Sequence, residues 1–113
     1  MAALKGAWAR NQRAVTTVLA LSELTALLTR PLRVPKIDQV HFLRAIRNDA
    51  AVEVVSLDSA LKAAAWSLGE ARLDKDWTLT DCASFVVLQR RGLTEAVTTD
   101  HHFEQAGFIR LLK

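Results

Sequence analysis

Short segments of two kinds alternate along this chain, and their alternation is the feature that most constrains its fold. Residues 14–17 and 52–55 are short and rich in β-branched side chains, which is typical of strands. Between and after them, leucine and alanine recur with the period of a helix. This alternation predicts an α/β fold with a mostly parallel sheet flanked by helices.

The boundaries of these elements follow from capping and helix-breaking residues. In the N-terminal half we expect a helix over 2–12, a strand over 14–17, a helix from 19 to near Pro31, a helix from Pro35 to about 48 and a strand over 52–55. Two longer helices follow, one to about 72 capped by Asp58 or Ser59 and one to about 91 capped by Thr80. The chain then continues with a strand over 95–98, a short helix over 101–106 and a strand over 108–112. No repeat or low-complexity linker interrupts them, and 113 residues suffice for one core. We therefore expect a single domain over residues 1–113.

Composition excludes several classes of protein. Apolar runs are broken by charges before they reach the roughly 18 residues of a membrane span, and the first residues do not resemble a signal peptide. A single cysteine, Cys82, excludes an intrachain disulfide and a zinc site of several cysteines. We therefore expect a cytoplasmic protein with no membrane partner. The net charge of +3 suits a nucleic-acid substrate, although many ordinary domains share it.

Three acidic residues lie where the predicted topology gathers ligands. Asp81 begins a helix, Asp100 directly follows a strand, and Glu23 lies near the start of the helix after the first strand. Helices that follow parallel strands begin at the carboxyl edge of the sheet, where ligands bind. We therefore expect the three carboxylates to lie close together. Without accompanying cysteine ligands they favour Mg²⁺ or Mn²⁺ over zinc.

Each carboxylate also has a structural interpretation. Asp81 in a first turn complements the helix dipole, and Asp100 before a short helix is a suitable N-cap. Glu23 lies between Leu19 and Leu27 on an apolar helical stripe, where an unpaired charge would cost several kcal/mol unless a cation were bound. The alternative is a glutamate at the edge of the stripe that reaches water or an arginine.

Two stretches in the C-terminal half carry a family signature. They are Leu-Thr-Asp-Cys-Ala-Ser-Phe at residues 79–85 and Thr-Thr-Asp-His-His-Phe-Glu-Gln-Ala-Gly-Phe at residues 98–108. In this order and near this spacing they resemble PIN-domain ribonucleases of the VapC-toxin type. The resemblance implies a metal-dependent endoribonuclease that cleaves RNA phosphodiester bonds. It also implies that Glu23, Asp81 and Asp100 are catalytic residues and ligands of Mg²⁺ or Mn²⁺.

The same resemblance implies partners and supporting residues. The implied partners are an RNA substrate, a VapB-like antitoxin whose C-terminal segment occupies the acidic groove, and a second copy in a homodimer. For Thr80 and Ser84, which match the motif, we favour a helix cap and a small residue facing the acids over direct catalysis. For His101 and His102 we favour loop ordering over metal binding, because imidazole suits softer metals.

The resemblance covers nearly all of this chain, but it departs from the family pattern at the start. PIN domains open with a strand that ends in an aspartate, and here the first acidic residue is Glu23. Residues 2–13 instead resemble the end of the helix before the second strand. We therefore expect an N-terminally truncated PIN-like domain without the first metal-binding aspartate and with impaired nuclease activity. The alternative function is an inactive PIN remnant that binds protein or RNA.

Overall fold

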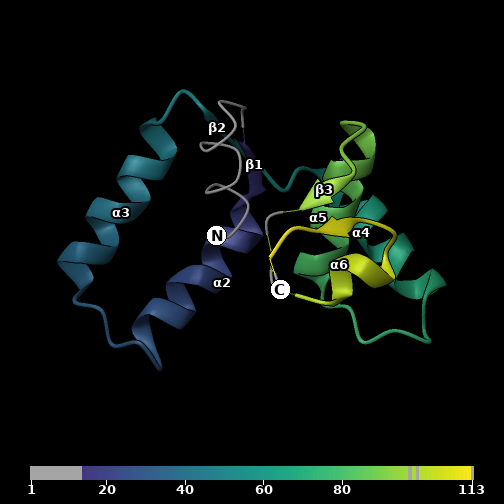
Figure 1. Ribbon diagram of the computed structural model, residues 1–113, viewed down its shortest axis with the longest axis horizontal. Coiled ribbons are helices and arrows are strands. Elements are labelled where there is room, and N and C mark those ends of the chain that lie inside the picture. Colours follow the sequence, from purple (N-terminus) through teal and green to yellow (C-terminus); the bar gives the residue numbers. More distant parts are fainter. Residues whose placement is uncertain (1–13, 97, 99, 113) are drawn as a thin grey trace.

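The computed structural model describes residues 14–96, 98 and 100–112 of the chain (Figure 1). The elements are β1 (Ala14–Thr17), α2 (Val18–Thr29), α3 (Lys36–Asn48), β2 (Val52–Val55), α4 (Ser59–Ala71), α5 (Leu79–Arg90), β3 (Glu95–Ala96), α6 (His102–Gln105) and β4 (Ile109–Arg110). This order of strands and helices confirms the predicted α/β fold. The expected helix over 2–12 lies outside the described residues.

Most boundaries follow from local sequence signals. Thr17 at the end of β1 caps α2 by accepting a hydrogen bond from the backbone of Ala20, and Asp58 caps α4 by accepting one from Leu61. In the described part of the chain β3 and β4 pair over two residues each, and residue 97 of the expected strand over 95–98 lies outside the described residues. Helix and strand boundaries up to α4 agree with the prediction within one or two residues.

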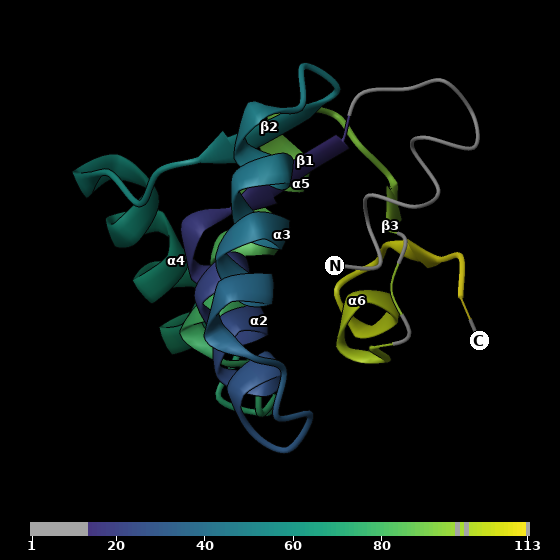
Figure 2. The same ribbon diagram turned by 90° about the vertical axis from the view of Figure 1, so that its left-hand side faces the viewer.

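All described strand pairs are parallel, as predicted. β1 pairs with β2 and places Ala14 opposite Val52, whereas β3 pairs with β4 and places Glu95 opposite Ile109. The described strands thus form two separate pairs. Figure 1 shows β1 and β2 with α2 and α3 in one half and β3 with α6 in the other. Figure 2 shows the same division, with α6 beside β3 and away from α2 and α3.

Helix α5 joins the two halves through its buried side chains. Val86 and Val87 form a core with Leu61 of α4, and the half-buried Val15 of β1 and Val55 of β2 pack against it. A neighbouring core on the same helix contains Ala65, Cys82 and Ala83. Because α5 packs against α4, β1 and α2 on one side and α6 on the other, it fixes the position of both halves.

An aromatic cluster surrounds Phe85, whose side chain is completely buried. The centroid of its ring lies 5.0 Å from that of Trp77, 4.9 Å from Phe103 and 5.7 Å from Phe108. The contacts with Trp77 and Phe103 are edge-to-face, the favourable geometry for aromatic pairs. This cluster holds the N-terminal half of α5, which carries Asp81, next to α6.

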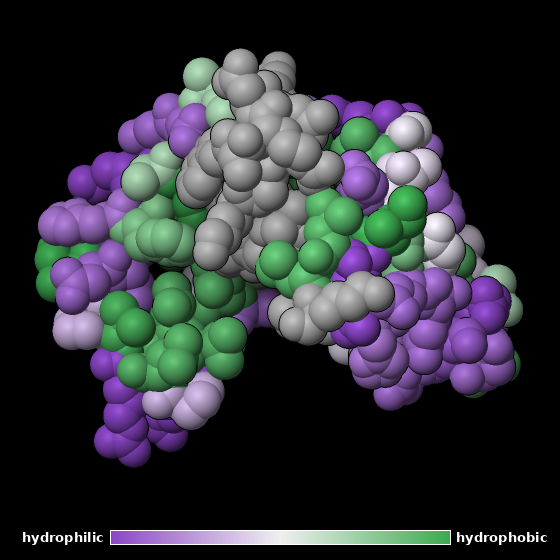
Figure 3. Space-filling view, in the orientation of Figure 1, coloured by the Kyte–Doolittle hydropathy of each residue, from purple (hydrophilic) through white to green (hydrophobic). Residues whose placement is uncertain are grey.

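The surface differs between the two halves. In Figure 3 hydrophobic side chains gather over α2, where Leu27 is exposed, and hydrophilic ones gather over the region of α6.

Within the described part of the chain, no helix combines the length and the apolar character needed to cross a membrane.

Candidate metal centre

Asp81 is held at the start of α5 by a capping box. The side-chain oxygen of Thr78 accepts a hydrogen bond from the backbone N–H of Asp81 at 3.1 Å, and Asp81 Oδ2 accepts one from the N–H of Thr78 at 3.0 Å. The cap is therefore Thr78, and the prediction that Thr80 caps this helix was wrong. A capping box needs a side-chain acceptor three residues after the cap. Thr78 has Asp81 in that place, whereas Thr80 has Ala83.

Asp100 is oriented by the backbone that leads into α6. Its Oδ1 atom accepts a hydrogen bond from the N–H of His102 at 2.9 Å, and its own N–H donates to the side-chain oxygen of Thr98 at 3.0 Å. The carboxylate thus supports the start of the short helix, in agreement with its structural interpretation, and it remains partly exposed.

His102 brings the two carboxylates together. Its Nδ1 atom lies 3.1 Å from Asp100 Oδ1 and 3.4 Å from Asp81 Oδ2. Its Nε2 atom lies 3.1 Å from Asp76 Oδ1. The side chains of His102 and Asp81 are only 17% and 12% exposed, whereas that of Asp76 is 87% exposed. One mostly buried imidazole is therefore surrounded by three carboxylates.

The charges around His102 act on its pKa. Burial alone would lower the pKa of the ring, but the nearby negative charges of Asp100, Asp81 and Asp76, with the hydrogen bond to Asp76, outweigh it and raise the pKa above the usual value. The environment of this ring therefore favours positive charge at the point where Asp81 and Asp100 meet.

The donor atoms at this point fit a divalent cation. His102 Nδ1 is buried and has no hydrogen-bond partner among the described residues. Asp100, His101 and His102 each offer a ligand atom, and these atoms lie within 4.8 Å of one another. Carboxylate oxygens are the ligands that Mg²⁺ and Mn²⁺ prefer. Asp81 and Asp100 could hold such an ion between them.

Glu23 is not one of the carboxylates that surround His102. Its side chain is exposed in the second turn of α2, and among the described residues it makes no hydrogen bond or ion pair. Of the two interpretations of Glu23, the structure agrees with the glutamate that reaches water, because Leu21 is the only buried residue of α2 and Leu27 is 48% exposed. A glutamate that reaches water needs no cation to offset burial.

Asp76 is the residue at this site that the sequence did not reveal. It precedes Trp77 in a segment without periodicity or recognised motif, and its approach to His102 spans 26 positions of sequence. Its nearest local signal is its position two residues before the capping threonine Thr78. Only the packing of Trp77 and α6 around Phe85 places it beside the imidazole.

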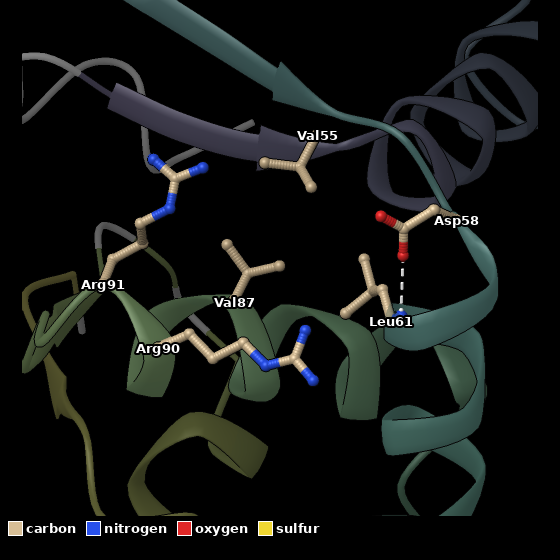
Figure 4. Close-up of a pocket in the computed structure, with 6 residues that line it drawn as sticks. All are labelled: Val55, Asp58, Leu61, Val87, Arg90 and Arg91. Atoms are coloured by element: carbon tan, nitrogen blue, oxygen red, sulfur yellow. Dashed lines mark hydrogen bonds between the residues drawn. The ribbon is translucent and has the colours of Figure 1, made fainter.

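A small pocket lies at the opposite end of α5 (Figure 4). Its cavity of about 110 Å³ is lined by Val55, Asp58, Leu61, Val87, Arg90 and Arg91. Arg91 also forms a bidentate ion pair with Glu53. Since Asp81 lies in the first turn of α5 and Arg90 is its last residue, this pocket is separate from the carboxylate cluster.

Comparisons with known proteins agree with this fold. The PIN domain family matches residues 1–109. No match is found among curated proteins. Among solved structures, the chain is similar to the crystal structure of VapC20 of Mycobacterium tuberculosis, a sarcin-ricin loop cleaving toxin, with a TM-score of 0.81 and 25% sequence identity over 96% of this chain and 82% of that one. This chain therefore belongs to the PIN domain family and is a VapC-type member of it.

Proposed function

We propose that this chain is a divalent-metal-dependent endoribonuclease of the VapC kind, in which Asp81 and Asp100 bind Mg²⁺ or Mn²⁺. The observation that carries the proposal is that these two carboxylates approach the same buried nitrogen of His102 at 3.4 and 3.1 Å. Family membership supports a nuclease. It also supports RNA as the substrate class, because the similar structure is that of a VapC toxin.

The ion and the chain would contribute differently to phosphodiester cleavage. A bound divalent ion would polarise a phosphodiester and lower the pKa of a water molecule that attacks it. The chain supplies preorganised ligands, because the N–H of Thr78 fixes Asp81 and the N–H of His102 fixes Asp100. Carboxylates that are already oriented lose little freedom when the ion binds.

Glu23 is the third carboxylate of the proposed site. Its helix, α2, packs directly against α5, which carries Asp81. Its exposed side chain makes no described contact that would have to be broken before it turned toward an ion or a substrate. The resemblance to PIN-domain ribonucleases, which implies that Glu23 is a metal ligand, supports this role, and the exposed carboxylate is accessible to an ion from the solvent.

A cleavage assay tests the nuclease proposal. Single-stranded and structured RNA is incubated with the wild type and with Asp81→Asn and Asp100→Asn, in Mn²⁺, in Mg²⁺ and in EDTA. The control is Asp74→Asn, because Asp74 is exposed and, within the described ranges, pairs only with Arg72 and Lys75. We expect metal-dependent cleavage by the wild type and the control and its loss in the other two variants. Equal cleavage by all four proteins would refute the proposed site.

The alternative is an inactive PIN domain that binds RNA or protein, and it is favoured because Glu23 is not among the described residues whose ligand atoms gather beside Asp100. Exposed cations such as Arg30 and Arg33 could hold RNA through phosphate contacts that weaken with salt. A gel shift that shows salt-sensitive RNA binding, with no cleavage in either metal, would support this alternative.

The proposal includes protein partners. A VapB-like antitoxin would insert a basic side chain beside Asp81 and Asp100, because paired carboxylates attract a guanidinium or ammonium group. The chain would also form a homodimer and act in the cytoplasm. Affinity purification of the folded chain should recover a small protein encoded beside its gene, and light scattering should give twice the mass of one chain. Recovery of the chain alone, as a monomer, would count against these partners.

A further inference from the structure

One ring nitrogen of His102 lacks a hydrogen-bond partner among the described residues. His102 Nδ1 is buried and accepts or donates no hydrogen bond among the described residues. Buried polar atoms are nearly always paired, so an unpaired one needs an explanation. Its nearest polar neighbours are the oxygens of Asp100 at 3.1 Å and Asp81 at 3.4 Å. A cation bound to this nitrogen and to a neighbouring carboxylate oxygen would give the nitrogen its missing partner.

The other ring nitrogen of His102 faces a carboxylate. His102 Nε2 lies 3.1 Å from Asp76 Oδ1. An ionised carboxylate only accepts hydrogen bonds, so Nε2 can donate to Asp76, and in the neutral ring that carries its hydrogen on Nε2 the Nδ1 atom has a lone pair for a cation. Histidine ligands of metals usually donate their other N–H to a carboxylate or carbonyl in this way, which fixes the tautomer and the direction of the ring.

The distances from His102 Nδ1 to the two carboxylate oxygens suit ligands of one ion. Ligand bonds of about 2.1 Å that meet at right angles in an octahedral site place neighbouring ligand atoms about 3.0 Å apart. The two separations from Nδ1, 3.1 and 3.4 Å, are close to that value. Asp81 Oδ2 and Asp100 Oδ1 each accept one backbone N–H. Each therefore keeps a second lone pair.

We propose that His102 is itself a ligand of the divalent ion through Nδ1, and that Asp76 is a positioning residue that orients its ring. This inference rests on the proposed function, since it requires an ion at Asp81 and Asp100, and it adds a nitrogen ligand to that site. Mg²⁺ takes oxygen ligands almost exclusively. An imidazole ligand therefore shifts the preference of the site toward transition metals, here Mn²⁺.

Pulsed electron paramagnetic resonance on the Mn²⁺-loaded protein tests the inference directly, because a coordinated imidazole gives a ¹⁴N coupling to the Mn²⁺ spin. We expect this coupling in the wild type and its loss in His102→Gln. His101→Gln tests the neighbouring ring, which lies 3.9 Å from Asp100 and also offers a ligand atom. We expect this variant to keep the coupling. The matched control is His41→Gln, because His41 is exposed on α3, and it should keep the coupling as well.

Affinity for Mn²⁺ gives a second readout, independent of cleavage. Calorimetric titration should show at least a tenfold loss of affinity in His102→Gln and about a tenfold loss in Asp76→Asn, the range seen when a residue that supports a metal ligand is changed. Asp76→Asn should keep the ¹⁴N coupling. Its side chain is 87% exposed, so this variant tests ring orientation with little risk to folding.

The outcomes separate this inference from the proposed function. Mn²⁺ that binds and depends on Asp81 but shows no ¹⁴N coupling in the wild type would overturn the ligand role of His102 and leave the proposed metal site intact. Coupling that disappears in His101→Gln would overturn the assignment to His102. No Mn²⁺ binding to the wild type would overturn both. The wild-type spectrum decides the question even if His102→Gln fails to fold.

Discussion

Trp77 donates its indole N–H to the side-chain oxygen of Gln105 at 3.0 Å, across 28 positions of sequence. The preceding residue, Asp76, makes the contact with His102. Two consecutive residues before α5 therefore bond to α6, and the ring of Trp77 packs against Phe85 beneath them. This short segment fixes the distance between the helix that carries Asp81 and the turn that carries Asp100.

The bond between Trp77 and Gln105 should be measurable by a double-mutant cycle. Trp77→Phe removes the N–H donor and keeps an aromatic ring against Phe85, and Gln105→Ala removes the acceptor. We expect a coupling free energy of about 0.5–1.5 kcal/mol in urea unfolding, the usual net value of one hydrogen bond. Gln89→Ala, on the exposed surface of α5, should add to Trp77→Phe without coupling. Simple additivity for Trp77→Phe with Gln105→Ala would show that the bond does not stabilise the fold.

The capping box predicts different costs for two nearby threonines. Thr78→Ala removes the side chain that accepts from the N–H of Asp81, so it should lower the free energy of unfolding by about 1 kcal/mol. Thr80→Ala should cost less, because Thr80 is not the cap. Urea unfolding of both variants measures the difference, and a larger loss for Thr80→Ala would contradict the assignment.

Divalent ions should stabilise the folded chain if Asp81 and Asp100 bind them. An ion that binds only the native state stabilises it by mass action, by about 2.7 kcal/mol at one hundred times its dissociation constant. Thermal melts with and without Mn²⁺ should show a rise in Tm for the wild type and for Asp74→Asn. Asp81→Asn should show no rise. Identical midpoints for the wild type in both conditions would be evidence against the ion.

Cys82 should be unreactive while the protein is folded. Burial raises the pKa of its thiol, and the charge of Asp81 raises it further, so little of the reactive thiolate forms near neutral pH. An aromatic disulfide reagent should react slowly with the native protein and quickly in urea. Fast reaction in the native state would show that the helix packing around Cys82 opens readily.

The same shift gives a dependence of stability on pH. Because folding raises the pKa of Cys82, its contribution to stability is fully present below the unfolded pKa of about 8.5 and is lost as pH rises through the folded pKa. The urea concentration at the unfolding midpoint should therefore fall as the solution becomes alkaline. This fall should be smaller in Cys82→Ala, which has no thiol, than in the wild type. Equal falls in the two proteins would contradict the shift.

Local signals account for what could be predicted from the sequence. The strand at 52–55 follows from β-branched residues, and the start of α4 follows from Asp58, because each signal acts within a few residues. Asp81 and Asp100 could be placed because each lies at the start of a helical segment. Their metal-binding roles stay predictions, as does that of Glu23.

Tertiary packing accounts for what could not be predicted. Whether Glu23 is buried depends on what covers α2, and its helical period alone does not contain that information. The contact between Asp76 and His102 exists because Phe85 gathers three other aromatic rings around itself, which is a property of the folded core. Whether Thr78 or Thr80 caps α5 depends on the hydrogen bond from the N–H of Thr78 back to the Asp81 side chain.

Helix α5 is buried at Asp81, Cys82, Ala83, Phe85, Val86 and Val87, so neither half of the molecule can separate from it without exposing a core. Its central amides should therefore exchange hydrogen with solvent only through global unfolding, whereas the one-turn helix α6 and the two-residue strand β4 can open in a smaller, local event. Asp81 lies on the part that stays closed, and Asp100 and His102 lie on the part that opens. The free energy of that local opening, rather than the stability of the whole chain, then sets the fraction of molecules in which the three side chains are assembled.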